Sequence, residues 1–196
     1  ISSGLSLIFG VMNILNFAHA TLWLVGAYFC YTFWYLLQGL EIGLWLSIPM
    51  AALTLGAIGW LIEVVLIRRV YKRELPEQLL LTYAMVLVLG DLIKIIWGVD
   101  DKLIERPSLV ADPVFIFGIP FDSYFIFVIC IGAAVAVGLW WFLQKTRYGQ
   151  IVRASVFSRE MVSALGIPIP RIYSGVFALG IFIAGLAGAV QAPVGS

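Results

Sequence analysis

The chain has 196 residues, of which 62% are hydrophobic and 12% are charged, and its formal net charge is +1. A water-soluble domain carries about twice that share of charged residues, so the composition excludes a soluble globular fold, and it also excludes disorder. The 12 basic and 11 acidic residues leave no basic excess for binding nucleic acid. The two cysteines, Cys30 and Cys130, match no metal-binding or redox spacing.

The first apolar segment, 4–18, is short and contains glycines and asparagines, which break helices. Asn13, Asn16 and His19 recur every three residues and therefore lie on one side of a helix. Polar groups at membrane depth normally face the protein interior or a water-filled path, and a broken helix offers free backbone groups to a solute. The segment is therefore predicted to line a pathway. The alternative is that the asparagines join neighbouring helices and His19 lies at the interface.

Five longer apolar segments, of about 17–25 residues each, are predicted to cross the membrane as helices. They cover residues 21–37, 43–67, 79–97, 123–143 and 172–192. The predicted fold class is therefore all-α: a polytopic transmembrane helical bundle with a broken N-terminal helix, in a single domain over 1–196. Because apolar sequence is already under way at Ile1 and no polar tail follows Gln191, we expect the domain to be truncated at both ends.

Basic residues gather in two of the four connections between these segments. The connections are 68–78, with Arg68, Arg69, Lys72 and Arg73, and 144–171, with Lys145, Arg147, Arg153, Arg159 and Arg171. Lys and Arg are retained on the cytoplasmic side, so both connections are predicted to lie inside the cell. The connection 98–122 lies on the other side, and its prolines and Gly118 fit either a short hairpin or an ordinary loop.

Small residues at four-residue spacing predict close helix packing within the bundle. The sets are Gly180, Ala184 and Gly188, then Ala52 and Gly56, then Ala134 and Gly138. Charges inside the spans are predicted to pair: Asp91 with Lys94 at a spacing of three, and Glu63 with Arg68 or Arg69. Asp91 and Lys94 can instead be read as functional charges of a carrier.

The cytoplasmic connection 144–171 is predicted to contain a short helix over 159–165. Ser158 can cap its first turn, Glu160 lies in that turn, and Gly166 followed by Pro168 ends it. Met161, Ala164 and Leu165 fall on one side of this helix. That side can lie flat on the membrane or enter a groove on a soluble partner, and the low charge of the helix favours a protein partner.

Catalysis finds little support in the sequence. There is no nucleophile–base set, no HExxH and no cysteine–histidine cluster that would hold a metal. An intramembrane enzyme would depend on His19 alone. The glycines over 180–185 have the spacing of a phosphate-binding loop but lack the lysine that follows it.

The two polar stretches together resemble the permease subunits of branched-chain amino-acid ABC importers, a family that also includes urea and short-chain amide permeases. At the N-terminal end the resemblance is carried by Gly4-Leu5, Asn16-Phe17-Ala18-His19 and Leu24-Val25-Gly26-Ala27-Tyr28. In the cytoplasmic connection and the last span it is carried by Gly149, Arg153-Ala154, Arg159-Glu160-Met161, Ala164-Leu165-Gly166-Ile167, Phe177 and Ala184-Gly185-Leu186-Ala187-Gly188.

The resemblance implies a non-catalytic subunit of the bacterial inner membrane, without a cofactor or metal of its own. Asn13, Asn16, Phe17 and His19 become candidates for the substrate pathway. The ATPase-docking element, or coupling helix, would comprise Arg153, Ala154, Ser158, Arg159, Glu160, Met161, Ala164, Leu165 and Gly166.

The partners that the resemblance implies are two ATP-binding subunits, which hold the ATP, a second permease subunit, similar or identical, and an external solute-binding protein. The cargo would be a branched-chain or related amino acid, urea or a short amide. The alternative is a secondary transporter or channel driven by an ion gradient, with Asp91 and Lys94 as functional charges.

Overall fold

The computed structural model of the chain describes residues 2–12, 14–40, 42–71, 73–100, 102, 104, 113–116 and 119–194. Its elements are almost entirely helical, which confirms the predicted all-α bundle. In chain order they are α1 (Ser2–Met12), α2 (Ala18–Leu36), α3 (Gly43–Val65), the 3-10 helix η1 (Ile67–Val70), α4 (Leu75–Trp97), strands β1 (Pro113–Ile116) and β2 (Ile119–Asp122), α5 (Ser123–Lys145), α6 (Arg147–Phe157), α7 (Arg159–Ala164) and α8 (Ile169–Gln191).

Four helices within the described part of the chain are long and apolar enough to cross a membrane: α3, α4, α5 and α8, each of 23 residues. At about 1.5 Å per residue, each is about 35 Å long, which exceeds the hydrocarbon thickness of about 30 Å. α2 coincides with the segment predicted over 21–37 and has 19 residues. The protein is therefore a multi-pass membrane protein.

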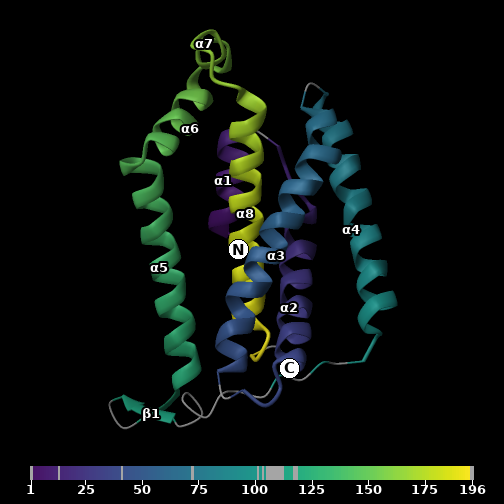
Figure 1. Cartoon of the computed structure of the whole chain (residues 1–196), viewed down its shortest axis with the longest axis vertical. Coiled ribbons are helices and arrows are strands. Elements are labelled where there is room, and N and C mark those ends of the chain that lie inside the picture. The colour runs from purple at the N-terminus through teal and green to yellow at the C-terminus, as the bar shows by residue number, and fades with distance from the viewer. Residues whose placement is uncertain are drawn as a thin grey trace.

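The N-terminal helix is broken, as predicted. α1 ends at Met12, residues 14–16 have no regular structure, Phe17 lies in a turn, and α2 begins at Ala18. In Figure 1, α1 and the first part of α2 lie beside α8 in the half of the bundle nearer to α7.

α8 lies at the centre of the bundle and packs against α3, α2 and α1 (Figure 1). The predicted small-residue face makes this packing possible, since Gly180, Ala184 and Gly188 are all buried. A Cβ atom placed on Gly26 of α2 would lie 2.7 Å from the Cα of Gly185. The backbones of α2 and α8 are therefore in direct contact. Such close packing stabilises helix association in a membrane, where the hydrophobic effect contributes little.

α5 stands apart from this core, so the close packing predicted for Ala134 and Gly138 was wrong within this chain (Figure 1). Both residues are exposed, and nothing lies within 4 Å of a Cβ built on Gly138. The reason is that α5 is held near its two ends. Tyr124 at its start bonds to Val190 of α8, and its other end turns sharply into α6.

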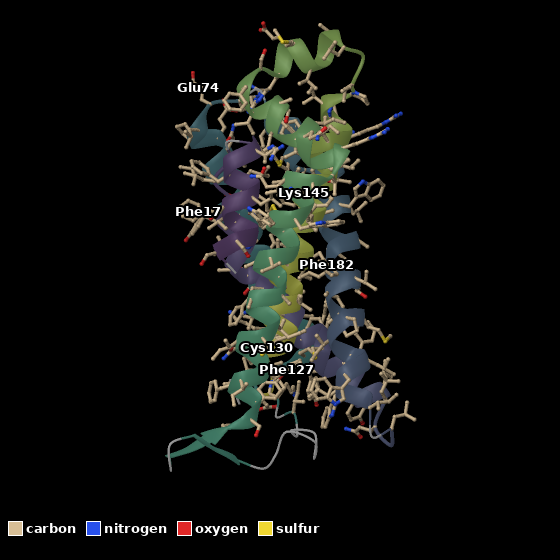
Figure 2. The ribbon with its side chains drawn as sticks, turned by 90° about the vertical axis from the view of Figure 1, so that its left-hand side faces the viewer. Phe17, Glu74, Phe127, Cys130, Lys145 and Phe182 are labelled. Atoms are coloured by element: carbon tan, nitrogen blue, oxygen red, sulfur yellow. The ribbon has the colours of Figure 1, made fainter. Side chains whose placement is uncertain are left out.

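The two basic connections lie at one end of the bundle, as the charge pattern predicts. Figure 1 places η1 and the start of α4 at the same end as α6 and α7, with the hairpin at the opposite end. Figure 2 shows Glu74 and Lys145 toward the α7 end and Phe127 toward the hairpin end. The hairpin reading of the 98–122 connection is confirmed by antiparallel pairing of Pro113 with Asp122 through Ile116 with Ile119. Gly118, which the prediction placed in the hairpin, lies outside the described residues.

Candidate functional site

α7 is a six-residue helix that projects from one end of the bundle and is capped at both ends (Figure 1). The Ser158 hydroxyl accepts a hydrogen bond from the Met161 amide at 3.2 Å, so it satisfies one of the free donors of the first turn. At the other end, the Gly166 amide donates to Ser163 and the Ile167 amide donates to Val162. Gly166 has a φ of +79°, the left-handed conformation that this type of cap requires. The helix ends at Ala164, one residue short of the predicted 159–165.

α6 was not foreseen from the sequence, although its N-cap is visible there as Thr146. The Thr146 hydroxyl accepts from the Gly149 amide at 3.0 Å. Gly149 also permits the sharp turn from α5, because a Cβ atom there would overlap the carbonyl oxygens of Phe142 and Leu143. The Tyr148 hydroxyl lies 3.3 Å from the Ile172 carbonyl and anchors α6 to α8. Burial raises the pKa of Tyr148, which keeps the hydroxyl protonated as a donor.

Three large apolar side chains stand in solvent around α7, and we call them the α7 tip: Phe157, Met161 and Leu165, at 91%, 67% and 74% exposure. A hydrophobic residue just before an N-cap commonly packs on the fourth helical residue, here Val162. Val162 is buried, but Phe157 does not cover it. An apolar surface of this kind beyond the bundle is suited to a protein partner. The predicted docking set omitted Phe157, whose position before Ser158 was the available signal.

The other residues predicted to dock divide into two groups. Four are exposed near the tip: Ala154, Glu160, Ala164 and Gly166. The two arginines, of which Arg159 is also exposed, bond to other helices. Arg153 donates a hydrogen bond to Gln144 at the end of α5, and Arg159 donates to the Met12 carbonyl of α1 at 3.0 Å.

Next to α7, the end of the bundle is held together by the fully buried carboxylate of Glu63 in α3. Arg68 lies 3.2 Å from it, which confirms the predicted pairing with the basic cluster. Tyr71 and Ser174 also donate to Glu63. All of its acceptor sites are therefore used, which is the condition under which a buried charge is tolerated.

Tyr71 and Tyr173 connect this cluster to α7. Their rings meet edge to face with centroids 5.3 Å apart, and the Arg159 guanidinium lies 5.3 Å from the Tyr173 ring centroid. Burial, followed by the hydrogen bond to Glu63 and its negative charge, raises the pKa of Tyr71. Tyr71 therefore remains a neutral donor to the carboxylate at physiological pH.

The helix break between α1 and α2 contains a buried amide. Asn16 is 3% exposed, and neither atom of its amide group has a hydrogen-bond partner among the described residues. The Thr82 hydroxyl of α4 lies 3.3 Å from the neighbouring Leu15 carbonyl, which places α4 against the break. A buried amide left without partners costs about 1–3 kcal/mol, so its oxygen and nitrogen are available to a water molecule or a solute.

The remaining pathway candidates do not share this position. His19 is buried, and its ring lies against Gly4, where a Cβ atom would meet it at 3.2 Å. Phe17 is 57% exposed, and Figure 2 shows it projecting outward from the bundle. Asn13 lies outside the described residues. The structure thus separates Phe17 from Asn16 and His19.

Two further features bear on transport. Asp91 and Lys94 form the predicted ion pair at 3.3 Å, and both side chains are largely exposed on the surface of α4. A cavity of about 410 Å³ lies between α1, α2, α5 and α8, with Ser3, Trp23, Ile131 and Ile183 among its lining residues. Of the predicted pathway residues that the structure describes, none lines this cavity.

A multi-pass bundle with a broken helix inside it and a capped, solvent-exposed helix at one end has the architecture of a membrane transport subunit. Comparison with known families agrees. The family model described as the permease component of the branched-chain amino acid transport system matches residues 1–194. The chain belongs to this family.

Several curated relatives resemble the chain over almost its whole length. It is 26% identical over 201 residues to the high-affinity branched-chain amino acid transport system permease protein LivH of Escherichia coli strain K12, covering 96% of this chain and 64% of that protein. It is 27% identical to the probable branched-chain amino acid transport permease protein LivH of Methanocaldococcus jannaschii, with 94% of this chain and 59% of that protein covered. The corresponding identity to the permease protein BraD of Pseudomonas aeruginosa is 27%, over 95% of this chain and 64% of that protein.

The chain therefore spans about 59–64% of the length of these relatives. No solved structure matches it.

Proposed function

We propose that the chain is the membrane-spanning, non-catalytic part of an ATP-driven importer of branched-chain or related amino acids, with urea and short amides as the alternative cargo. Family membership over residues 1–194 is the observation that carries this proposal. The names of the relatives from Escherichia coli and Pseudomonas aeruginosa point to the same class of solute. The membrane would be the inner membrane of a bacterium.

In this proposal the α7 tip docks on ATP-binding subunits. Phe157, Met161 and Leu165 would insert into a groove on such a subunit, as an amphipathic helix does on a soluble partner. The complete importer would contain two ATP-binding subunits, which bind and hydrolyse the ATP, a second permease subunit and an external solute-binding protein. The chain itself would need no cofactor or metal. The caps at Ser158 and Gly166 support this role, because they hold a six-residue helix in shape without a membrane or partner.

Transport would follow from alternating exposure of the helix break to the two sides of the membrane. ATP binding and hydrolysis on the partners would move α7, and the bundle would change between outward-open and inward-open states. The Asn16 amide is the polar group we propose on the solute path: its oxygen can accept from an ammonium group and its nitrogen can donate to a carboxylate. His19, beside the break, would shape the path from within the bundle.

Docking is tested by a charge placed in the α7 tip. In Leu165→Glu, a buried charge would oppose insertion of the tip, and we expect binding of the ATP-binding subunits to weaken about 30-fold or more, the loss typical of a central interface residue. Ser163→Glu is the matched control, because it adds the same charge to α7 at an exposed residue outside the tip. Binding is measured by titrating labelled ATP-binding subunits onto the permease in nanodiscs. Equal binding by wild type and Leu165→Glu would refute docking through α7.

The gradient-driven alternative depends on Asp91 and Lys94, and the exposed position of this pair on α4 gives it no support. Asp91→Asn distinguishes the two functions in proteoliposomes that contain the complete transporter. The ATP-driven importer predicts unchanged solute uptake with ATP. A carrier that uses Asp91 predicts that uptake stops whatever the ATP supply.

A further inference from the structure

Arg159 connects α7 to a helix that lies far from it in sequence. It is the first residue of α7, yet its guanidinium does not extend into the α7 tip. Its Nη2 atom donates a hydrogen bond to the Met12 carbonyl oxygen at 3.0 Å, and its Cζ atom lies 5.3 Å from the centre of the Tyr173 ring. One side chain therefore joins the docking helix, the end of α1 and the start of α8.

The Met12 carbonyl is an unusual acceptor because Met12 is the last residue of α1. The last carbonyls of a helix have no partner within the helix and carry the negative end of its dipole. The chain then breaks over residues 14–17, and no backbone amide of these described residues bonds to the last carbonyls of α1. A guanidinium at this position supplies a charge-assisted hydrogen bond, which is stronger than a neutral one. Arg159 acts as a C-terminal cap for α1 from 147 residues away.

The position of Met12 relative to the break gives this contact a role in transport. Met12 precedes Asn16, the buried amide of the break, by four residues. A displacement of α7 that is transmitted through Arg159 would therefore act on the end of α1 directly beside Asn16. The Arg159 guanidinium also lies over the Tyr173 ring, so a second contact holds it near the start of α8.

We propose that Arg159 is a positioning residue that holds the end of α1 to α7, so that the helix break moves when the ATP-binding subunits move α7. This inference rests on the proposed docking function of α7. It differs from the sequence-based expectation for Arg159, which placed this residue among those that dock on the ATPase. The two roles predict different defects when the guanidinium is removed.

Three variants separate these roles in the complete transporter, reconstituted with its ATP-binding subunits and solute-binding protein. Arg159→Gln removes the charge-assisted bond. Arg159→Lys keeps a charged donor without the planar stacking group. Arg171→Gln is the matched control, because it removes the same charge from an exposed residue in the first turn of α8. The readouts are binding of the ATP-binding subunits, ATP hydrolysis and leucine uptake per ATP hydrolysed.

We expect Arg159→Gln to bind the ATP-binding subunits as wild type does, while leucine transported per ATP falls about tenfold or more, the scale for losing a hydrogen bond to a charged group. Arg159→Lys should retain an intermediate ratio, and Arg171→Gln the wild-type ratio. An unchanged ratio in Arg159→Gln would overturn the proposal. So would loss of subunit binding in Arg159→Gln, or an equal fall in Arg171→Gln.

A distance measurement tests the mechanical link directly. Spin labels at Ser163 of α7 and Phe9 of α1, both exposed, report the separation of the two helices. We expect this separation to stay the same between nucleotide-free and ATP-trapped transporter when Arg159 is present, and to change in Arg159→Gln. If the separation changes equally in wild type and in Arg159→Gln, the link through Arg159 is refuted, while the proposed docking of α7 is not affected. Wild-type chain that fails to bind the ATP-binding subunits overturns the proposed function as well.

Discussion

The hydroxyl of Tyr124 donates a hydrogen bond to the carbonyl oxygen of Val190 at 2.7 Å and ties the start of α5 to the last turn of α8. Most of α5 is exposed, so few other contacts hold this helix to the bundle if the bond is lost. We expect Tyr124→Phe to lower the stability of the purified protein by about 1–2 kcal/mol, since the Val190 carbonyl would stay buried without its donor. Thermal unfolding in detergent measures the effect. Tyr83→Phe, at an exposed residue of α4, should leave the transition where it is.

Removal of the buried carboxylate should destabilise the α7 end of the bundle. Glu63→Ala leaves Arg68, Tyr71 and Ser174 without their common acceptor. Breaking a buried ion pair lowers the free energy of unfolding by about 3–5 kcal/mol. Because the Arg68 side chain is 38% exposed and can turn to water, we expect a smaller loss of about 2 kcal/mol. Glu63→Gln keeps an acceptor oxygen and should lose less. Equal thermal unfolding of Glu63→Ala and wild type would show that the cluster adds no net stability.

Gly26 lies where α2 and α8 are too close for any larger residue. Gly26→Ala would place a Cβ atom 2.7 Å from Gly185 Cα and 2.8 Å from its carbonyl oxygen, neither of which can move without its helix. We expect a loss of about 1–3 kcal/mol, the usual cost of overpacking. Gly90→Ala in α4 is the control, because nothing lies within 4 Å of the added atom and alanine favours a helix. Unfolding in denaturant should rank Gly90→Ala at or above wild type and Gly26→Ala below it.

Asn16 should matter for uptake more than for stability. Replacement of an unpartnered buried amide by an apolar group of similar size is close to neutral, so we expect Asn16→Leu to change stability by less than about 1 kcal/mol. If the amide contacts the solute, leucine uptake should fall about tenfold or more. Both are measured on the same preparation. A large loss of stability with normal uptake per folded molecule would assign Asn16 to the packing of the break instead.

The sidedness of the bundle predicts which cysteines a membrane-impermeant reagent can reach. After replacement of Cys30 and Cys130, a cysteine at Ser163 should react only from the cytoplasmic side and a cysteine at Gln38 only from the opposite side. Intact cells and inside-out vesicles give the two accessibilities. Labelling of Ser163 in intact cells would place α7 where no ATP-binding subunit can reach it.

The features that could be predicted from sequence are those set by local chemistry. The helix break follows from glycines and asparagines in a short apolar segment, and the limits of α7 follow from Ser158 and Gly166. The central place of α8 follows from its small residues at four-residue spacing. The pairing of Asp91 with Lys94 needs only three residues of helix.

Features that depend on distant parts of the chain could not be predicted in this way. Ala134 and Gly138 have the spacing of a packing face, but spacing does not say which helix faces it, and none of the described helices does. Arg159 lies beside the α7 tip in sequence, yet its guanidinium contacts α1 and α8, because the Met12 carbonyl and the Tyr173 ring are there. Phe17 follows Asn16 directly, but at the turn between α1 and α2 the Asn16 side chain is buried and the Phe17 side chain is exposed.

The sharp join between α5 and α6 makes α5 a lever. Because the backbone at Gly149 fits against the carbonyls of Phe142 and Leu143, the two helices should tilt together rather than bend at the join. α5 is about 35 Å long, so a tilt of about 5° would carry its far end by about 3 Å. A small motion at one membrane surface would thereby arrive, enlarged, at the other, where the hydrogen bond from Tyr124 to Val190 would pass it to α8.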